Sequence, residues 1–221
     1  AGEAIASVLA GDVNPSGKLP FTWYARLEDC GAHALNTYPG TWRPDHKIID
    51  EEYKEGIYVG YRYFQTAGVT VSYPFGYGKS YTTFEYSKPV VKATDKGFTA
   101  TITVKNTGAV AGKESVQLYV AAPAGGLEKP AFELKGFAKT KGLAPGESQT
   151  LTIDVCRYTL ASFNEANSAW ETAAGTYKVM FGANAADIRG TAEYKLKKAE
   201  SWKVNNVLAP AEAINEISLQ K

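Results

Sequence analysis

The stretches "FTATITVKN" (residues 98–106) and "ESVQLYVAA" (residues 114–122) decide the fold of this chain. Both alternate apolar and polar side chains with a period of two, which is the pattern of a strand with one face in a core. The same alternation recurs in four further stretches, at residues 132–140, 148–155, 175–183 and 190–198. Turn sequences rich in Gly, Pro and Asn separate them. Together they predict an antiparallel β-sandwich of the immunoglobulin or fibronectin type III kind over residues 88–200.

Three other zones surround this predicted sandwich. Residues 1–23 are typical of a helix that ends at Gly11, a turn, and a short buried strand "KLPFTW", which together form a fragment of a βα-type layer. Residues 24–87 form a connecting segment rich in aromatic residues, and residues 201–221 form a polar C-terminal tail with few apolar side chains. Because one helix and one strand cannot cover their own apolar faces, the first zone requires a partner that this chain does not supply.

Composition narrows the class of protein. The chain has 221 residues, 24 Lys plus Arg and 23 Asp plus Glu, so its net charge of +1 gives no electrostatic reason to expect nucleic acid or an anionic membrane. No apolar run approaches the roughly 20 residues that cross a bilayer. Cys30 and Cys156 lie far apart, and two buried free thiols are expected, although a bridge between them stays open. The compartment also stays open, with a secreted or periplasmic location preferred to a cytoplasmic one.

Several stretches, in this order along the chain, form a recognisable series: "GEAIASVLAGDVNPSGKLPFTW", "YKEGIYVGYRYF", "YPFGYGKSYTTFEY", "VKNTGAVAGKESVQLYV", "EKPAFELKGFAKTKGLAPGESQTLTIDV" and "GTYKVMFGA". Together they resemble the C-terminal part of glycoside hydrolase family 3 enzymes, the family of β-glucosidases and β-xylosidases. The resemblance implies a (β/α)8 barrel, then an α/β sandwich domain, then a fibronectin type III-like domain. Residues 1–23 then correspond to the last helix and strand of the α/β sandwich. The expected fold class is mainly β, with that helix-strand remnant in front.

The resemblance also implies a reaction, which is retaining glycoside hydrolysis by two carboxyl groups. In the family, the nucleophile is an aspartate on the barrel, and the acid/base is commonly a glutamate in the second domain. Both precede the motif that matches residues 1–23, so no residue of this chain is expected to be catalytic. The expected partners are the barrel and α/β sandwich portion of the same enzyme and a β-linked oligosaccharide, with no metal or organic cofactor. An oligomer remains compatible with the sequence.

Some residues are candidates for contact with sugar or with other domains. Tyr38, Trp42 and Arg43 lie in the loop "NTYPGTWRPDHK", and side chains of these types stack on sugar rings or bind sugar hydroxyls. An exposed aromatic loop that only packs on the barrel would have the same composition, so this alternative stays open. The group Tyr58, Tyr61, Arg62, Tyr63 and Phe64 is expected at a seam between domains, because aromatic rings bury large areas. Trp170 and Tyr177 are expected in the sandwich core.

Three other motifs receive structural interpretations. Gly78-Lys79-Ser80 ends like a phosphate-binding loop, but Tyr73 replaces the required glycine and a strand-like stretch follows, so a glycine-rich bend is favoured. The acidic run at residues 50–55 is interpreted as a solvated face or as anchors for Arg62. His33 and His46, near Cys30, lack further ligands at a useful spacing for a metal.

Two alternatives to the enzyme portion are a β-sandwich module that binds carbohydrate or a cell-surface partner without catalysis, and a plain spacer. Sugar-binding sandwiches usually present a flat row of exposed aromatic rings, whereas most aromatic residues of 88–200 alternate inward. A spacer does not explain "GDVNPSGKLPFTW" and "YKEGIYVGYRYF".

Overall fold

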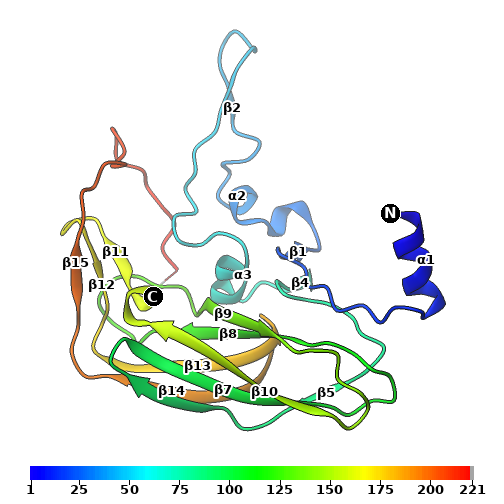
Figure 1. Cartoon of the computed structure of the whole chain (residues 1–221). Coiled ribbons are helices and arrows are strands. Elements are labelled where there is room, and N and C mark those ends of the chain that lie inside the picture. Colours follow the sequence, from blue (N-terminus) through cyan, green and yellow to red (C-terminus); the bar gives the residue numbers. More distant parts are fainter. Residues whose placement is uncertain (220–221) are drawn as a thin grey trace.

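The computed structural model describes residues 1–219, and a β-sandwich forms its largest part (Figure 1). One sheet has the order β14 (Asp187–Leu196), β13 (Gly175–Asn184), β8 (Ser115–Ala121), β9 (Glu133–Lys139). In the other sheet, β7 pairs with β10 and with two shorter strands; the bounds are β7 (Gly97–Asn106), β10 (Ser148–Cys156), β5 (Phe84–Tyr86) and β6 (Val90–Thr94). These pairs are antiparallel. The six predicted strands are confirmed as β7, β8, β9, β10, β13 and β14.

Alternate side chains from the two sheets meet in the sandwich core. Along β7 the apolar residues from Phe98 to Val104 are buried, and the threonines between them stay partly exposed. The facing strands contribute the rest of the core, which includes Phe98, Ile102, Val116, Leu118, Tyr177, Val179 and Phe181. Each large apolar side chain that is fully buried contributes about 1.5–3 kcal/mol. The period-two pattern therefore fixes which face of each strand turns inward, and Tyr177 lies in the core as predicted.

A second, smaller sheet lies beside the sandwich and was not predicted. It has the order β11 (Ser162–Asn164), β12 (Ala169–Glu171), β15 (Ser201–Lys203). Trp170 lies opposite Phe163 on one side and Trp202 on the other. The prediction that Trp170 belongs to the sandwich core is wrong, because its strand pairs within this separate sheet and its ring, half-buried, packs against Tyr158 and Phe163.

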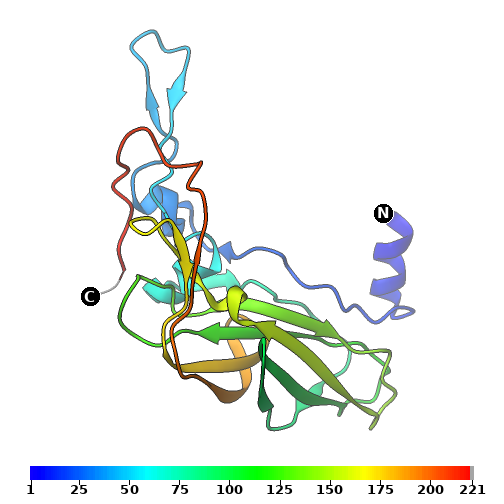
Figure 2. The same cartoon turned by 60° about the vertical axis from the view of Figure 1, so that its left-hand side comes forward.

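Residues 1–23, called the arm below, extend from the sandwich. The helix α1 (Gly2–Ala10) ends at Gly11 with a φ of 85°, as its sequence predicted, and it buries no residue. Figures 1 and 2 show α1 standing apart from the remaining elements in both views. The expected buried strand "KLPFTW" is wrong in extent and in burial. Only Trp23 belongs to a strand, β1 (Trp23–Tyr24), which pairs with β4 (Val71–Tyr73), and its side chain is 56% exposed.

The connecting segment contains short helices and a projecting hairpin. The helices are η1 (Leu27–Asp29), α2 (Gly31–Ala34) and α3 (Tyr61–Ala67), and the hairpin pairs β2 (Thr41–Trp42) with β3 (Ile49–Asp50). Both views show this hairpin pointing away from the sandwich. Within residues 1–219, every helix is too short or too polar to span a lipid bilayer.

The tail returns to the connecting segment after β15. The backbone N–H of Ile217 donates to the carbonyl oxygen of Lys54 at 2.9 Å. Ile217 and Leu219 pack against a buried cluster of Tyr58, Tyr63 and Phe64. The few apolar residues of the tail therefore close this cluster from one side.

Candidate functional site

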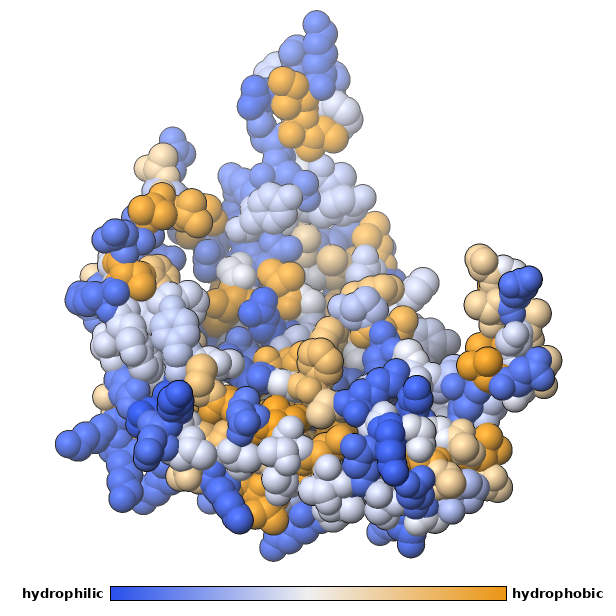
Figure 3. Space-filling model, in the orientation of Figure 1, coloured by the Kyte–Doolittle hydropathy of each residue, from blue (hydrophilic) through white to orange (hydrophobic). Residues whose placement is uncertain are grey.

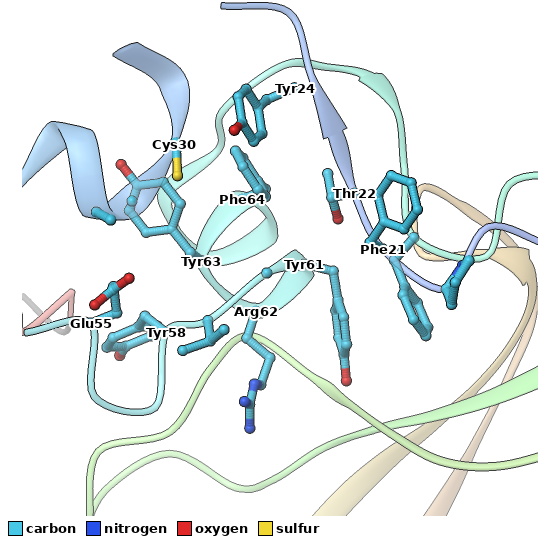
Figure 4. A pocket seen from close by; sticks show the side chains of 16 residues that line it. Phe21, Thr22, Tyr24, Cys30, Glu55, Tyr58, Tyr61, Arg62, Tyr63 and Phe64 are labelled. Carbon is cyan, nitrogen blue, oxygen red and sulfur yellow. The ribbon is translucent and has the colours of Figure 1, made fainter. Parts of the chain in front are cut away.

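A cavity of about 440 Å³ opens between the strand β1 and the helix α3 (Figure 4). Its lining is mainly aromatic and apolar, and Glu55 and Arg62 supply charged groups. The other lining residues are Pro20, Phe21, Thr22, Tyr24, Cys30, Gly31, Ala32, Tyr58, Val59, Gly60, Tyr61, Tyr63, Phe64 and Phe75. Concave surfaces of this kind, with few polar groups among aromatic side chains, are typical of binding sites.

The ring of Tyr61 anchors α3 to the sandwich. It stacks on Phe75 with ring centroids 4.8 Å apart, and its edge meets Tyr119 of β8 at 6.0 Å. Its hydroxyl accepts a hydrogen bond from the backbone N–H of Leu134 at 2.7 Å, and burial raises the pKa of Tyr61. Arg62 adds an ion pair with Glu133 of β9, Nη1 to Oε1 at 3.7 Å. Tyr61 and Arg62 of the predicted group therefore join the connecting segment to the sandwich, whereas Tyr63 and Phe64 lie in a separate cluster with Tyr58.

Tyr58 lies below the cavity and ties the tail to the same seam. It is 1% exposed, and its hydroxyl donates to Glu128 Oε1 at 2.7 Å. The backbone N–H of Leu219 donates to the same carboxylate oxygen at 2.8 Å. Burial and the Glu128 carboxylate raise the pKa of Tyr58 above its ordinary value. Tyr58 in the cavity wall is thus connected, through the Glu128 carboxylate, to Leu219 of the tail.

Thr22 contributes a polar atom that the described structure leaves unsatisfied. The residue is 8% exposed, and its hydroxyl oxygen Oγ1 has no hydrogen-bond partner within residues 1–219. Figure 4 shows this side chain pointing from the segment before β1 into the space beside Phe64 and Tyr61. A buried hydroxyl without a partner is costly, so its position in a cavity wall is informative.

A buried ion pair fastens the segment that leads to the cavity. Lys18 Nζ lies 3.1 Å from Glu114 Oε1 and donates to the carbonyl oxygen of Ala183 at 3.1 Å. Tyr86 donates to the same Glu114 oxygen at 3.0 Å. Burial and the negative charge of Glu114 raise the pKa of Tyr86. These contacts hold residues before β1 against the sandwich, and sequence reasoning missed them because the partners are about 100 and 170 positions apart.

The glycine-rich bend lies on the other side of the same segment. Leu19 exchanges two backbone hydrogen bonds of 2.8 Å with this bend, one with Gly76 and one with Tyr77. Gly76 has a φ of 79°, and a Cβ on Gly78 would come within 2.2 Å of the Gly17 carbonyl oxygen. The strand β5 follows the Gly78-Lys79-Ser80 sequence, as the bend interpretation predicted.

The three sugar-contact candidates lie on or next to the projecting hairpin. Trp42, on β2, is 53% exposed, and Tyr38, just before the hairpin, is 47% exposed. Arg43 binds both carboxylate oxygens of Asp50, with Nη2–Oδ1 at 2.7 Å and Nε–Oδ2 at 2.8 Å. Figure 3 shows apolar side chains gathered on this hairpin and on α1, at the two ends of a hollowed face. The structure therefore brings Trp42 and Arg43 together on the projecting hairpin.

The remaining motifs have structural roles. Asp50, Glu51 and Glu52 are exposed, and Asp50 pairs with Arg43. The interpretation as anchors for Arg62 is wrong, since Arg62 pairs with Glu133. Within residues 1–219, no three His, Cys, Asp or Glu side chains are grouped so as to hold a metal ion.

The two cysteines are free, but the expectation that both are buried is wrong. Cys156 is exposed and Cys30 is half-buried. Cys156 Sγ lies 3.0 Å from Thr159 Oγ1, a hydrogen bond that is the main cause of its lowered pKa.

The small sheet carries a group of aromatic rings that bears on the alternative of a sugar-binding module. The ring of Tyr158 lies at 54° to that of Trp170 and at 77° to that of Trp202. Phe163 and Trp170 are tilted by 53°. Rings inclined in this way do not form the flat row that the alternative requires.

Two family models match the chain, one near its N-terminal end and one in the sandwich. Residues 114–185 match the fibronectin type III-like domain. Residues 1–61 match the glycosyl hydrolase family 3 C-terminal domain. The chain matches the C-terminal portion of glycosyl hydrolase family 3 proteins. The second match includes α1, β1, the hairpin and the first residue of α3, so much of the cavity wall lies within the residues that match the family 3 C-terminal domain.

Curated relatives and solved structures are similar to this chain over most of its length. Beta-glucosidase BoGH3A of Bacteroides ovatus is 44% identical over 200 residues, which cover 88% of this chain and 26% of the relative. Beta-glucosidase 3B from Thermotoga neapolitana, solved with glucose, superposes with a TM-score of 0.84 at 41% identity and covers 90% of this chain and 27% of that structure. The Kluyveromyces marxianus beta-glucosidase, also with glucose, gives a TM-score of 0.82 at 40% identity over 91% and 24%. The chain thus spans about a quarter of the length of the relatives it matches.

Proposed function

We propose that this chain is the C-terminal structural portion of a retaining, exo-acting β-glycosidase whose preferred substrates are terminal β-linked glucosides. Its work is to complete the α/β sandwich domain and to support the domains that hold the active site. One observation carries this proposal: the arm that matches the family 3 domain exposes the apolar side chains of Leu9 (78%), Phe21 (49%) and Trp23 (56%). Phe21 and Trp23 lie side by side, with ring centroids 5.8 Å apart, and neighbouring exposed apolar side chains of this kind are typical of an interface with another part of a protein.

The proposed reaction uses two carboxyl groups, a nucleophile and an acid/base, about 5–5.5 Å apart. We place both in the upstream portion. The carboxylates described above have other partners: Glu114 binds Lys18 and Tyr86, and Asp50 binds Arg43. These contacts support structural roles for them, so the chain alone is expected to be inactive.

Tyr38, Trp42 and Arg43 are proposed to reach the substrate-binding cleft of the whole enzyme. The hairpin that carries Trp42 and Arg43 projects from the body of the chain, and the bidentate contact between Arg43 and Asp50 stiffens it. An exposed indole presents a flat apolar face that suits the C–H groups of a sugar ring.

The test is complementation between two chains. The upstream portion of BoGH3A, truncated where its match to this chain begins, is expressed alone and with all 221 residues of this chain. Hydrolysis of p-nitrophenyl β-D-glucoside and β-D-xyloside is then measured. Activity only in the mixture, in a complex that elutes as one species with both chains, supports the proposal. Activity of this chain alone, or an inactive mixture that does form the complex, contradicts it.

The hairpin is tested in the active complex. Trp42→Ala is expected to raise KM for the glucoside without weakening the complex, because the indole would contact the sugar. Phe137→Ala is the matched control, since this ring is 72% exposed on β9 of the sandwich. Equal KM values for the two variants would show that Trp42 does not contact the substrate.

A further inference from the structure

We propose that the cavity beside α3 is the seat for an apolar segment of the upstream portion of the same enzyme, and that Thr22 Oγ1 donates a hydrogen bond to a carbonyl oxygen of that segment. The proposal rests on the proposed function and specifies where and through which groups the two portions meet. It assigns Thr22 as a positioning residue of the interface.

The apolar side chains and the single unpartnered hydroxyl of the lining indicate what kind of group fills the cavity. Seven of the sixteen lining residues are aromatic, and four of these belong to β1 or α3, so the group that fills the cavity must be mainly apolar. Thr22 adds a single buried donor, 8% exposed and unpartnered within residues 1–219. An apolar chain segment with a backbone carbonyl meets both demands, because it fills the volume and satisfies the hydroxyl at once.

The position of the cavity indicates which part of the enzyme supplies that segment. Twelve of the sixteen lining residues lie within residues 1–61, the part that matches the family 3 domain. The relatives carry about three quarters of their length outside the matched region. Phe21 lines the cavity and is also half exposed beside Trp23, so the cavity continues into the exposed apolar surface of the arm. A partner that covers this surface therefore reaches the cavity without a second binding event.

The tail does not supply the missing acceptor. Its residues Ile217 and Leu219 pack on the side of Tyr58, and no oxygen of the described tail forms a hydrogen bond with Thr22 Oγ1. The Tyr61 hydroxyl, which accepts from Leu134, does not bond to Thr22 Oγ1 either. The Thr22 hydroxyl is thus left for a group from outside the described residues.

The experiment uses the complex with the upstream portion of BoGH3A and compares Thr22→Val with Thr22→Ser. Valine keeps the shape and removes the hydroxyl, whereas serine keeps the hydroxyl. For the free chain, Thr22→Val is expected to leave the urea midpoint unchanged or raise it, because a buried polar atom without a partner is removed. For the complex, the same variant is expected to raise Kd about tenfold, since the acceptor loses its donor. Thr22→Ser is expected to raise Kd less than Thr22→Val does.

Three results would overturn the proposal. The first is an unchanged Kd for Thr22→Val in a complex that forms and is active, which leaves the proposed function intact. The second is a lower urea midpoint of the free chain with Thr22→Val, which shows that the hydroxyl already has a partner. The third is binding of glucose or glycerol by the free chain at millimolar concentration, abolished by Thr22→Val, which shows that the cavity takes a small polyol instead.

Discussion

Replacement of Lys18 by Met tests whether the arm is fastened to the sandwich by a buried ion pair. The ammonium group lies 3.1 Å from Glu114 Oε1, and the two side chains are only 18% and 7% exposed. Methionine has nearly the same length and removes the charge. Glu114 then stays buried with Tyr86 as a hydrogen-bond donor, and its charge loses its ionic partner.

The expected loss follows from this burial. Removal of one member of a buried ion pair costs about 3–5 kcal/mol, and the partial exposure of Lys18 places the variant at the lower end, about 3 kcal/mol. For a chain of this size, that free energy corresponds to a fall in Tm of about 6–12 °C. Urea and thermal unfolding, followed by circular dichroism and tryptophan fluorescence, measure it.

Lys141→Met provides the matched control. Lys141 pairs with Glu147 at 2.5 Å, yet the two side chains are 62% and 36% exposed, so water screens the pair and little change is expected. Equal losses of stability in the two variants would refute the reasoning, because burial would then have no influence on the cost.

Further predictions concern pH, a thiol and the tail. Burial raises the pKa of Tyr86 above the value of about 10 that it has in the unfolded chain. The neutral phenol therefore contributes fully to the free energy of unfolding below about pH 10, and this contribution is lost as the pH rises further. Tyr86→Phe should reduce the alkaline fall in the free energy of unfolding, measured by urea titration at several pH values. Cys156 should react with Ellman's reagent faster than Cys30, and Thr159→Val should slow the reaction because the hydrogen bond that lowers the pKa is lost; no change in rate would contradict the assigned cause. Ile217→Asp should expose the tail to limited proteolysis, whereas Val207→Asp, at a residue 81% exposed, should leave the cleavage rate unchanged. Equal cleavage of these two variants would show that the tail is not held by Ile217.

Much of the sandwich was predictable from the sequence because alternation reports directly which side of a strand is buried. In β7 and β10 this signal extends over nine or ten residues. The strands β11, β12 and β15 have three residues each, too few for any period to be read. Trp170 was therefore assigned to the wrong core on residue type alone.

The candidate site was predictable only in part. Tyr58 and Tyr61, which contact the sandwich, are predictable because aromatic density is a local signal. Thr22 matters because one buried atom lacks a hydrogen-bond partner, and Lys18 matters because it contacts a residue 96 positions away. The residues next to Thr22 and Lys18 in the sequence do not reveal either fact. "KLPFTW" was expected to be a buried strand from its composition, but burial depends on neighbours that the described residues do not provide.

The return of the tail to α3 has a consequence for the order of events during synthesis. The cluster around Tyr58 and Phe64 is completed by Ile217 and Leu219, about 160 residues later in the chain. At about 5–20 residues per second, the ribosome needs roughly 8–30 s to make that interval. The cluster beside the cavity is therefore completed only after the sandwich has been translated, and the docking proposed above must wait for that moment.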